Sequence, residues 1–225
     1  MIHHEIIEQI AAEFEHRSNP QMAEKMAQYM RNLFPFYGIQ KPDRAMILRP
    51  LMKELIKVST RENIEEIAQT LWNKPQREFQ YICIEYLEKV QKHWQEGRSI
   101  RFFENLIVTK SWWDSVDFIA SHLVGKYFLQ YEWELPDIID KWNTDDNFWL
   151  NRTAIIYQLS YKEKTDVDIL SKVIETHIES KEFFIQKAIG WALRQYAYTN
   201  PEFVLSFVQN HKLAPLSKRE ALKNL

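Results

Sequence analysis

The sequence has little glycine, almost no cysteine and no long apolar run. Glycine occurs 4 times in 225 residues, which is too few for an architecture built on hairpins and tight turns. The single cysteine, Cys83, excludes an intrachain disulfide and is typical of a reducing compartment. No apolar run approaches the roughly 20 residues that cross a bilayer, and the charged N-terminus is unlike a signal peptide. We therefore expect a soluble, cytoplasmic protein.

Several motifs of known chemistry are also missing. The sequence contains no Gly-rich phosphate loop, no G-x-S-x-G, no H-E-x-x-H and no C-x-x-C. Cys83 has no histidine near it in sequence, which favours a structural thiol over a nucleophile. His3 and His4 lack further Cys or His at ligand spacing, so the sequence predicts no metal site and no cofactor. The net charge of -2 gives no overall attraction to nucleic acid, although a local basic groove remains compatible with it.

Helical periodicity dominates what is present. Apolar residues recur at three- and four-residue spacing almost throughout, beginning with a stripe of Ile6, Ile7, Ile10 and Phe14. Pro50 should kink or split the helix that starts at Pro42, and Thr60 should cap the next one. Because no segment alternates as a strand would, the predicted fold class is all-α. Further helices are expected over 114–124, 136–142, 147–160, 165–178, 181–197, 200–211 and from 216 onward.

Three segments resemble one another: EFQYICIEYL (78–87), FWLNRTAIIYQL (148–159) and EFFIQKAIGWAL (182–193). Their spacing fits a repeat of about 35 residues with one helix pair each, which is typical of an α-solenoid. We expect a HEAT-like α-α superhelix that curves, with its concave face as the usual binding surface. No linker rich in Gly, Ser or Pro divides the chain, so a single domain over 1–225 is predicted.

The stretch TKSWWDSVDF places two tryptophans beside two aspartates. Trp113 and Asp117 are four residues apart and would share one helix face. Alternatively, Asp114 caps the helix and both tryptophans pack in the core. A second group is DDNFWLNRTA, in which Arg152 lies among apolar residues. Such an arginine either pairs with a buried carboxylate or points out toward an anion.

A third group, QKAIGWALRQY, interleaves cations with an aromatic side chain. Lys187 and Trp191 are four residues apart, and Arg194 follows three residues later. Cations beside aromatics suit a nucleic-acid groove, while the alternative for Lys187 and Arg194 is a solvated helix face. Gly190 within the helix costs about 1 kcal/mol against Ala, which is tolerable where another backbone comes close.

At these same residues the chain closely resembles the AlkD-type DNA alkylation repair proteins. The resemblance runs in order over essentially the whole chain. It is carried by NPQMAEKMAQYMRNLFPFYGIQKPDR, LIVTKSWWDSVDFI, DNFWLNRTAIIYQLSYK, SKEFFIQKAIGWALRQYA and LAPLSKREALK. It implies a HEAT-like DNA glycosylase that removes positively charged alkylated purines, chiefly 3-methyladenine and 7-methylguanine. Duplex DNA would then bind in the concave groove of a monomeric enzyme that needs no cofactor.

The resemblance also implies roles for five residues. It places the catalytic aspartate at Asp117, the site tryptophans at Trp113 and Trp191, an arginine at Arg152 and a tyrosine at Tyr29. Asp117 would stabilise an oxocarbenium-like sugar and orient water, and the tryptophans would hold the deoxyribose. Arg152 would contact a phosphate, and Tyr29 would bond another or close the wall of the site. Lys187 and Arg194 would be further DNA contacts. The competing hypothesis is a non-catalytic HEAT-like scaffold that binds DNA or a protein.

Overall fold

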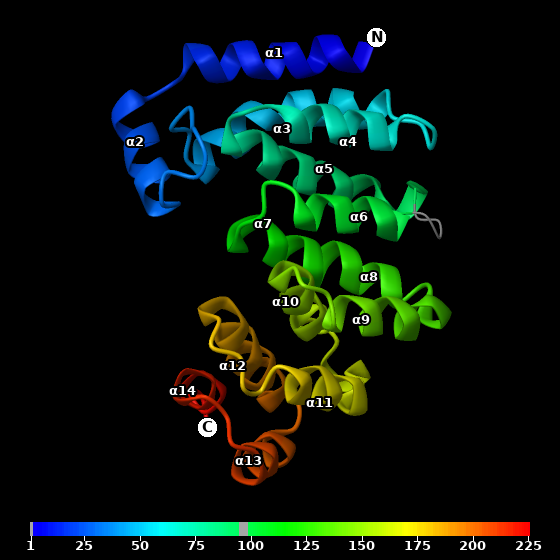
Figure 1. The fold of residues 1–225 in the computed structure, drawn as a ribbon. Helices are drawn as coiled ribbons and strands as arrows, with labels where there is room; N and C mark the ends of the chain where they lie inside the picture. The colour runs from blue at the N-terminus through cyan, green and yellow to red at the C-terminus, as the bar shows by residue number, and fades with distance from the viewer. Residues whose placement is uncertain (1, 95–98) are drawn as a thin grey trace. The chain divides into compact units, whose positions relative to one another are not determined.

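The computed structural model describes residues 2–94 and 99–225, and Figure 1 traces their course. Every regular element within these ranges is a helix, so the all-α prediction is confirmed for the part of the chain described. None of the helices in these ranges is long and apolar enough to span a bilayer. Contacts divide the chain into two compact units, Met1–Glu96 and Gly97–Leu225. The prediction of one domain over 1–225 stays a prediction.

The N-terminal unit is built from five helices among its described residues. They are α1 (Ile2–His16), α2 (Pro20–Tyr29), α3 (Lys41–Lys57), α4 (Ile64–Asn73) and α5 (Arg77–Trp94). Within this unit α1 packs on α3 and α4, and α5 lies along both of those helices (Figure 1). The stripe predicted on α1, from Ile6 to Phe14, is buried as expected.

A buried carboxylate ties the loop before α3 to α5. Glu78 is fully buried, and its Oε1 accepts hydrogen bonds from the backbone N–H groups of Gly38 (3.0 Å) and Ile39 (3.2 Å). Burial raises the pKa of Glu78, and the backbone hydrogen bonds oppose that shift. Gly38 has a φ of 85°, and a Cβ there would lie 2.2 Å from the Asn19 carbonyl oxygen. The loop therefore requires glycine at this position.

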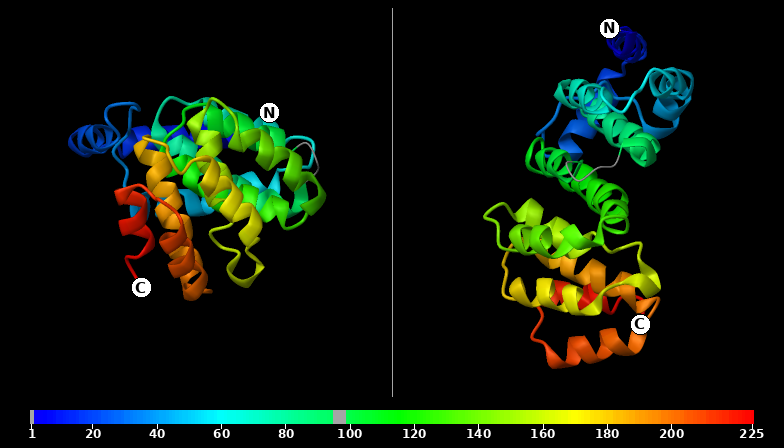
Figure 2. Two further views of the ribbon diagram at one scale, coloured as in Figure 1. Left: turned by 60° about the horizontal axis from the view of Figure 1, so that its bottom comes forward. Right: turned by 90° about the vertical axis from the view of Figure 1, so that its right-hand side faces the viewer.

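The C-terminal unit continues the helical pattern in shorter segments. It contains α6 (Ser99–Val108), α7 (Trp113–Phe118), a π-helical stretch η1 (Ile119–Val124), α8 (Gly125–Phe128), a 3-10 turn η2 (Glu132–Glu134), α9 (Leu135–Asn143), α10 (Phe148–Ile156), a second 3-10 turn η3 (Lys162–Lys164), α11 (Val167–Thr176), α12 (Phe183–Ala197), α13 (Pro201–Asn210) and α14 (Pro215–Ala221). Within the unit α10 packs against both α9 and α12, and α12 packs against α13 and α14. Figure 2 shows α12 and α14 side by side.

Two local features differ from the sequence predictions. Of the kink or split predicted at Pro50, the split is excluded, because α3 runs from Lys41 to Lys57 with Pro50 inside it. Thr60 is not the cap of α4, since Asn63 occupies that position and the helix begins at Ile64. The Asn63 side chain instead holds the preceding turn, accepting from the Thr60 N–H at 2.7 Å. Both differences arise because several helix boundaries are compatible with the same local residues, and packing selects among them.

Gly190 is explained by the close approach of α14 to α12. A Cβ at this position would lie 2.5 Å from Glu220 Cβ and 2.8 Å from the Ser217 carbonyl oxygen. The hydroxyl of Ser217 also donates to the Gln186 carbonyl at 2.9 Å. The expectation that glycine is tolerated here because another backbone comes close is therefore confirmed, and α14 is fastened directly to α12.

We predict that Gly190→Ala lowers the free energy of unfolding despite the better helix propensity of alanine. Propensity favours Ala by about 1 kcal/mol, while forcing a methyl group into a filled site typically costs about 1–3 kcal/mol. The displacement should fall on α14, the neighbour that a Cβ would meet. Urea denaturation compares the variant with wild type. Equal or greater stability in the variant would show that α14 does not pack so closely on α12.

Candidate active site

The short helix α7 presents Asp117 at the start of an irregular stretch. The chain is extended at Trp112 (φ -159°, ψ 158°), and α7 then runs from Trp113 to Phe118. The π-helix η1 follows directly, and π-helical turns are frequent at functional sites. Asp114 does not cap α7. Its Oδ1 accepts the N–H of the next residue, Ser115, at 2.9 Å, and Trp112 holds the cap position.

Asp117 and Arg152 form a two-point ion pair between α7 and α10. Arg152 Nε donates to Asp117 Oδ1 at 2.7 Å, and its Nη2 donates to Oδ2 at 2.8 Å. A third donor, Nη1, bonds the carbonyl oxygen of Phe184 on α12. The Arg152 side chain is 5% exposed and that of Asp117 is 15% exposed. The sequence left two readings of Arg152 open, and the structure supports pairing with a buried carboxylate.

The ionisation of Asp117 is governed by two opposing effects. Burial raises the pKa of its carboxyl above the ordinary value, and the hydrogen bonds and charge of Arg152 lower it. The nearby Asp114 adds a small upward contribution. The net shift is upward, so the ionised form of Asp117 depends on its arginine partner. Each carboxylate oxygen retains acceptor capacity beyond the bond from Arg152.

A hollow of about 310 Å³ opens beside Asp117. Trp191 on α12 lies on the same wall, so the structure brings together two residues that are far apart in sequence. The lining comes from α7, η1, α12 and the turn after α10. Its members are Asp117, Phe118, Ser121, His122, Leu159, Ser160, Trp191 and Gln195.

Aromatic rings enclose the buried side of the ion pair. Phe184 lies near the Arg152 guanidinium, with 5.9 Å from Cζ to the ring centroid. Trp112 meets Phe184 edge to face at a centroid distance of 5.2 Å, and Trp149 lies 5.0 Å from the same ring. These rings exclude water from one side of Arg152, which strengthens its interaction with Asp117. The two adjacent tryptophans thus have different positions, Trp112 in this cluster and Trp113 beside Asp117 on α7.

The remaining predicted site residues lie in three places. Trp113 is half-buried, one helical turn before Asp117. Lys187 and Arg194 on α12 both pair with Glu220 of α14, at 3.0 Å from Lys187 Nζ and 2.7 Å from Arg194 Nη1. Tyr29 ends α2 in the N-terminal unit, where 70% of it is exposed. It is not among the residues that line the hollow.

His122 and Glu220 were missed by reasoning from the sequence alone. His122 stacks on Phe118 at a centroid distance of 4.3 Å, and its Nδ1 lies 2.9 Å from the Ser121 hydroxyl. The π-helical turn places His122 in the hollow with Asp117. His122 follows the candidate catalytic residue Asp117 by five positions, and this spacing could have marked it as a site residue. Glu220 gave no such signal, because its partners are 26 and 33 residues away.

Comparisons with known proteins identify the family and the fold of this chain. A family model described as DNA alkylation repair enzyme matches residues 10–225. A solved structure described as a predicted DNA alkylation repair enzyme from Enterococcus faecalis is 36% identical, and the match covers 92% of this chain and 96% of that one. Its TM-score of 0.85 supports the predicted α-α superhelical repeat fold. Among curated proteins, no sequence matches the chain significantly. By sequence over nearly its whole length and by fold, this chain belongs to the family of DNA alkylation repair enzymes.

Proposed function

We propose that the protein is a DNA glycosylase of base excision repair. It hydrolyses the N-glycosidic bond of positively charged alkylated purines, 3-methyladenine and 7-methylguanine, in duplex DNA. The observation that carries this proposal is the Asp117 carboxylate, held at two points by Arg152 and lining the same hollow as Trp191. A fixed, partly desolvated carboxylate beside an aromatic wall suits a reaction that develops positive charge on a sugar.

The chemistry needs few groups because the substrate is already activated. An N-alkylated purine carries a positive charge, so the base departs neutral when its bond to C1′ breaks, taking the bonding electrons. The sugar is left as an oxocarbenium-like cation, which the negative charge of Asp117 stabilises. Water oriented by Asp117 then adds to C1′ and loses its proton, completing hydrolysis. Neutral lesions keep a stronger glycosidic bond and react slowly, because charge rather than pocket shape selects the substrate.

The proposed DNA contacts are those that the family resemblance implies. Trp113 and Trp191 offer faces to the deoxyribose and to the developing cation. Arg152 is buried against Asp117, so orienting that carboxylate is its first task. Its phosphate contact, like those of Tyr29, Lys187 and Arg194, stays a prediction. So do the concave groove, the monomeric state, the cytoplasmic location and the independence from metal or cofactor.

The alternative function is a non-catalytic scaffold that binds DNA or a protein partner. A purely structural ion pair would explain the link between α7 and α10, but not why Asp117 also lines a hollow with Trp191. A carboxylate costs desolvation free energy wherever it is buried. The Asp117 to Arg152 pair therefore favours catalysis, and the following experiment separates the two functions.

Asp117→Asn should abolish most base release. Removing one preorganised electrostatic interaction typically lowers a rate by about 10²–10³-fold. The measurement is release of 7-methylguanine from a singly modified duplex at low salt, with binding of the same duplex measured in parallel. Wild type should release the base, and the variant should bind DNA but release it at least about 10²-fold more slowly.

Asp168→Asn is the matched control, because Asp168 is an exposed aspartate at the start of α11 in the same unit. It should release the base at the wild-type rate. A uracil-containing duplex tests charge selection and should react poorly with all three proteins. Absence of release by wild type would leave the scaffold function standing, and equal rates for wild type and Asp117→Asn would place the chemistry elsewhere.

The pH dependence of the rate should report the ionisation of Asp117. Only the carboxylate form stabilises the cation, so the rate falls as pH drops through the pKa of this group, which burial holds above its ordinary value. Arg152→Met removes the hydrogen bonds and charge that lower this pKa, so the midpoint moves to higher pH. Arg152→Lys keeps a charge and should shift the midpoint less.

The measurement is a pH–rate profile for each protein, corrected for spontaneous base loss. Circular dichroism checks that each variant is folded, because removing one partner of a buried pair can cost about 3–5 kcal/mol. A folded Arg152→Met protein with the wild-type midpoint would show that Asp117 does not set the profile.

Glu220→Gln should strengthen DNA binding. Glu220 neutralises Lys187 and Arg194, so removing its charge leaves both cations available to phosphates. Each additional phosphate contact steepens the slope of log affinity against log salt by about 1. Affinity is measured by fluorescence anisotropy over a salt series. Glu202→Gln, an exposed glutamate on α13, should behave as wild type. Unchanged affinity and slope in Glu220→Gln would refute a DNA role for this cation pair.

A further inference from the structure

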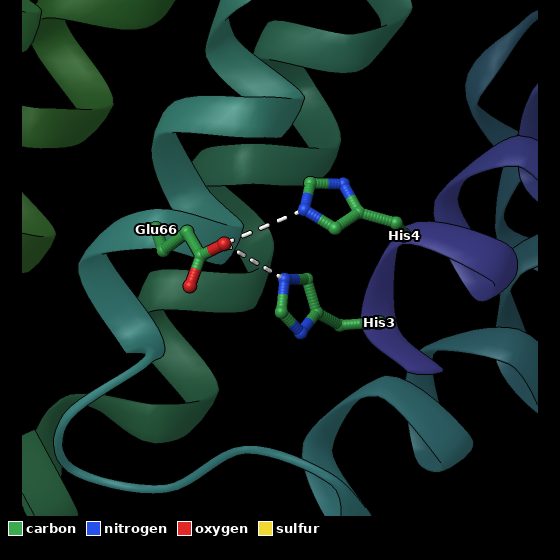
Figure 3. A group of neighbouring side chains, drawn as sticks. All are labelled: His3, His4 and Glu66. Atoms are coloured by element: carbon green, nitrogen blue, oxygen red, sulfur yellow. Dashed lines mark ion pairs between the residues drawn. The ribbon is translucent and has the colours of Figure 1, made fainter. Parts of the chain in front are cut away.

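We propose that His3, His4 and Glu66 form a binding site for a divalent transition metal ion, and that Zn²⁺ is the preferred ion. The three side chains lie in the N-terminal unit, where the start of α1 faces α4 (Figure 3). No step in the proposed base release uses them. The sequence predicts no metal here because no third ligand lies near the two histidines. In the folded chain Glu66, 62 residues after His4, supplies that ligand.

The two distances to Glu66 are compatible with a metal coordination sphere. Glu66 Oε1 lies 3.3 Å from His3 Nε2 and 3.4 Å from His4 Nε2. A hydrogen bond between N–H and oxygen is most often about 2.9–3.0 Å long. Two ligands held about 2.0–2.1 Å from a tetrahedral ion lie about 3.3–3.4 Å apart. One ligand atom from each of the three residues lies within 4.8 Å of the others.

Both histidines turn toward the same carboxylate. Neighbouring residues on a helix ordinarily point in different directions, yet the rings of His3 and His4 lie 4.4 Å apart and both direct Nε2 at Glu66 (Figure 3). The His3 side chain is 8% exposed, and its Nε2 makes no hydrogen bond in the structure. A buried nitrogen without a hydrogen-bond partner costs free energy, and a metal ion would satisfy it through the ring lone pair.

The types of ligand atom indicate which metal ions the site would prefer. Two imidazole nitrogens and one carboxylate oxygen suit Zn²⁺ and its neighbours among the divalent transition metals, whereas Mg²⁺ and Ca²⁺ prefer sites made of oxygen. Three protein ligands leave a fourth tetrahedral position for water. His4 and Glu66 are each at least half exposed, so solvent and ions can reach the site.

A bound ion would join α1 to α4. The ligands are in the first turns of the two helices, and α1 already packs on α4 through its buried stripe. An ion that binds only the folded arrangement stabilises it in proportion to occupancy. The metal would therefore hold the start of α1 against the rest of its unit, a structural role separate from the chemistry at Asp117.

The experiment titrates ZnCl₂ into the full chain, prepared without a histidine tag, by isothermal titration calorimetry. Wild type should bind one ion per chain. Glu66→Gln and His4→Gln each remove one ligand at an exposed position, which leaves the core intact. Loss even of a supporting partner of a ligand typically lowers metal affinity about 10–100-fold, so each variant should lose at least that much. Thermal unfolding should show a rise in midpoint with Zn²⁺ for wild type and none for the variants.

Glu65→Gln is the matched control, because Glu65 is the neighbouring carboxylate on α4 and lies outside the cluster. It should bind Zn²⁺ as wild type does. Co²⁺ provides a second readout, since a tetrahedral nitrogen and oxygen site gives intense visible absorption in wild type and loses it in Glu66→Gln. The proposal is overturned if wild type binds no stoichiometric ion, or if Glu66→Gln and His4→Gln retain wild-type affinity. Either result would leave the cluster as an ion pair of histidines with Glu66.

Discussion

The candidate site depends on one buried ion pair. Arg152 connects three helices: its own helix α10, α7 through Asp117, and α12 through the carbonyl oxygen of Phe184. Two charges removed from water are tolerated only where geometry and further hydrogen bonds offset the cost of desolvation. That requirement fixes the distance between α7 and α10 and the rotamer of Asp117. The same interaction that holds these helices together therefore points the carboxylate.

The ion pair has an apolar, buried side and a side that opens to a hollow. On the buried side, rings from Trp112, Trp149 and Phe184 exclude water and strengthen the pairing. On the open side, Asp117 lines a hollow together with Trp191 and His122. Lys187 and Arg194, about one helical turn to either side of Trp191 on α12, pair with Glu220 of α14. A net charge of -2 and a DNA substrate are compatible when the distribution of charge, rather than its sum, controls binding.

The N-terminal unit also contains polar contacts between residues that are far apart in sequence. Glu78 holds the loop at Gly38 and Ile39 by hydrogen bonds across about 40 positions of sequence. His3 and His4 meet Glu66, which is separated from them by two whole helices. In each case a polar side chain meets a partner from a distant segment: Glu78 Oε1 accepts two backbone hydrogen bonds, whereas His3 Nε2 lies beside Glu66 without a hydrogen bond. Such partners are required because an unsatisfied buried polar group is costly.

The sequence by itself determined the helical class, the buried stripe of α1 and the need for a close backbone at Gly190. Through resemblance it nominated Asp117, Trp113, Trp191 and Arg152 as site residues. These follow from periodicity, from the absence of a Cβ and from matched motifs, which are local properties of the chain. Only the tertiary structure decided that Asp117 is the partner of Arg152, that Glu220 holds Lys187 and Arg194, and that Asn63 rather than Thr60 caps α4. Periodicity reports which face of a helix is buried. The partner that meets a given side chain depends on how whole helices pack, and that is set by contacts between segments far apart in sequence.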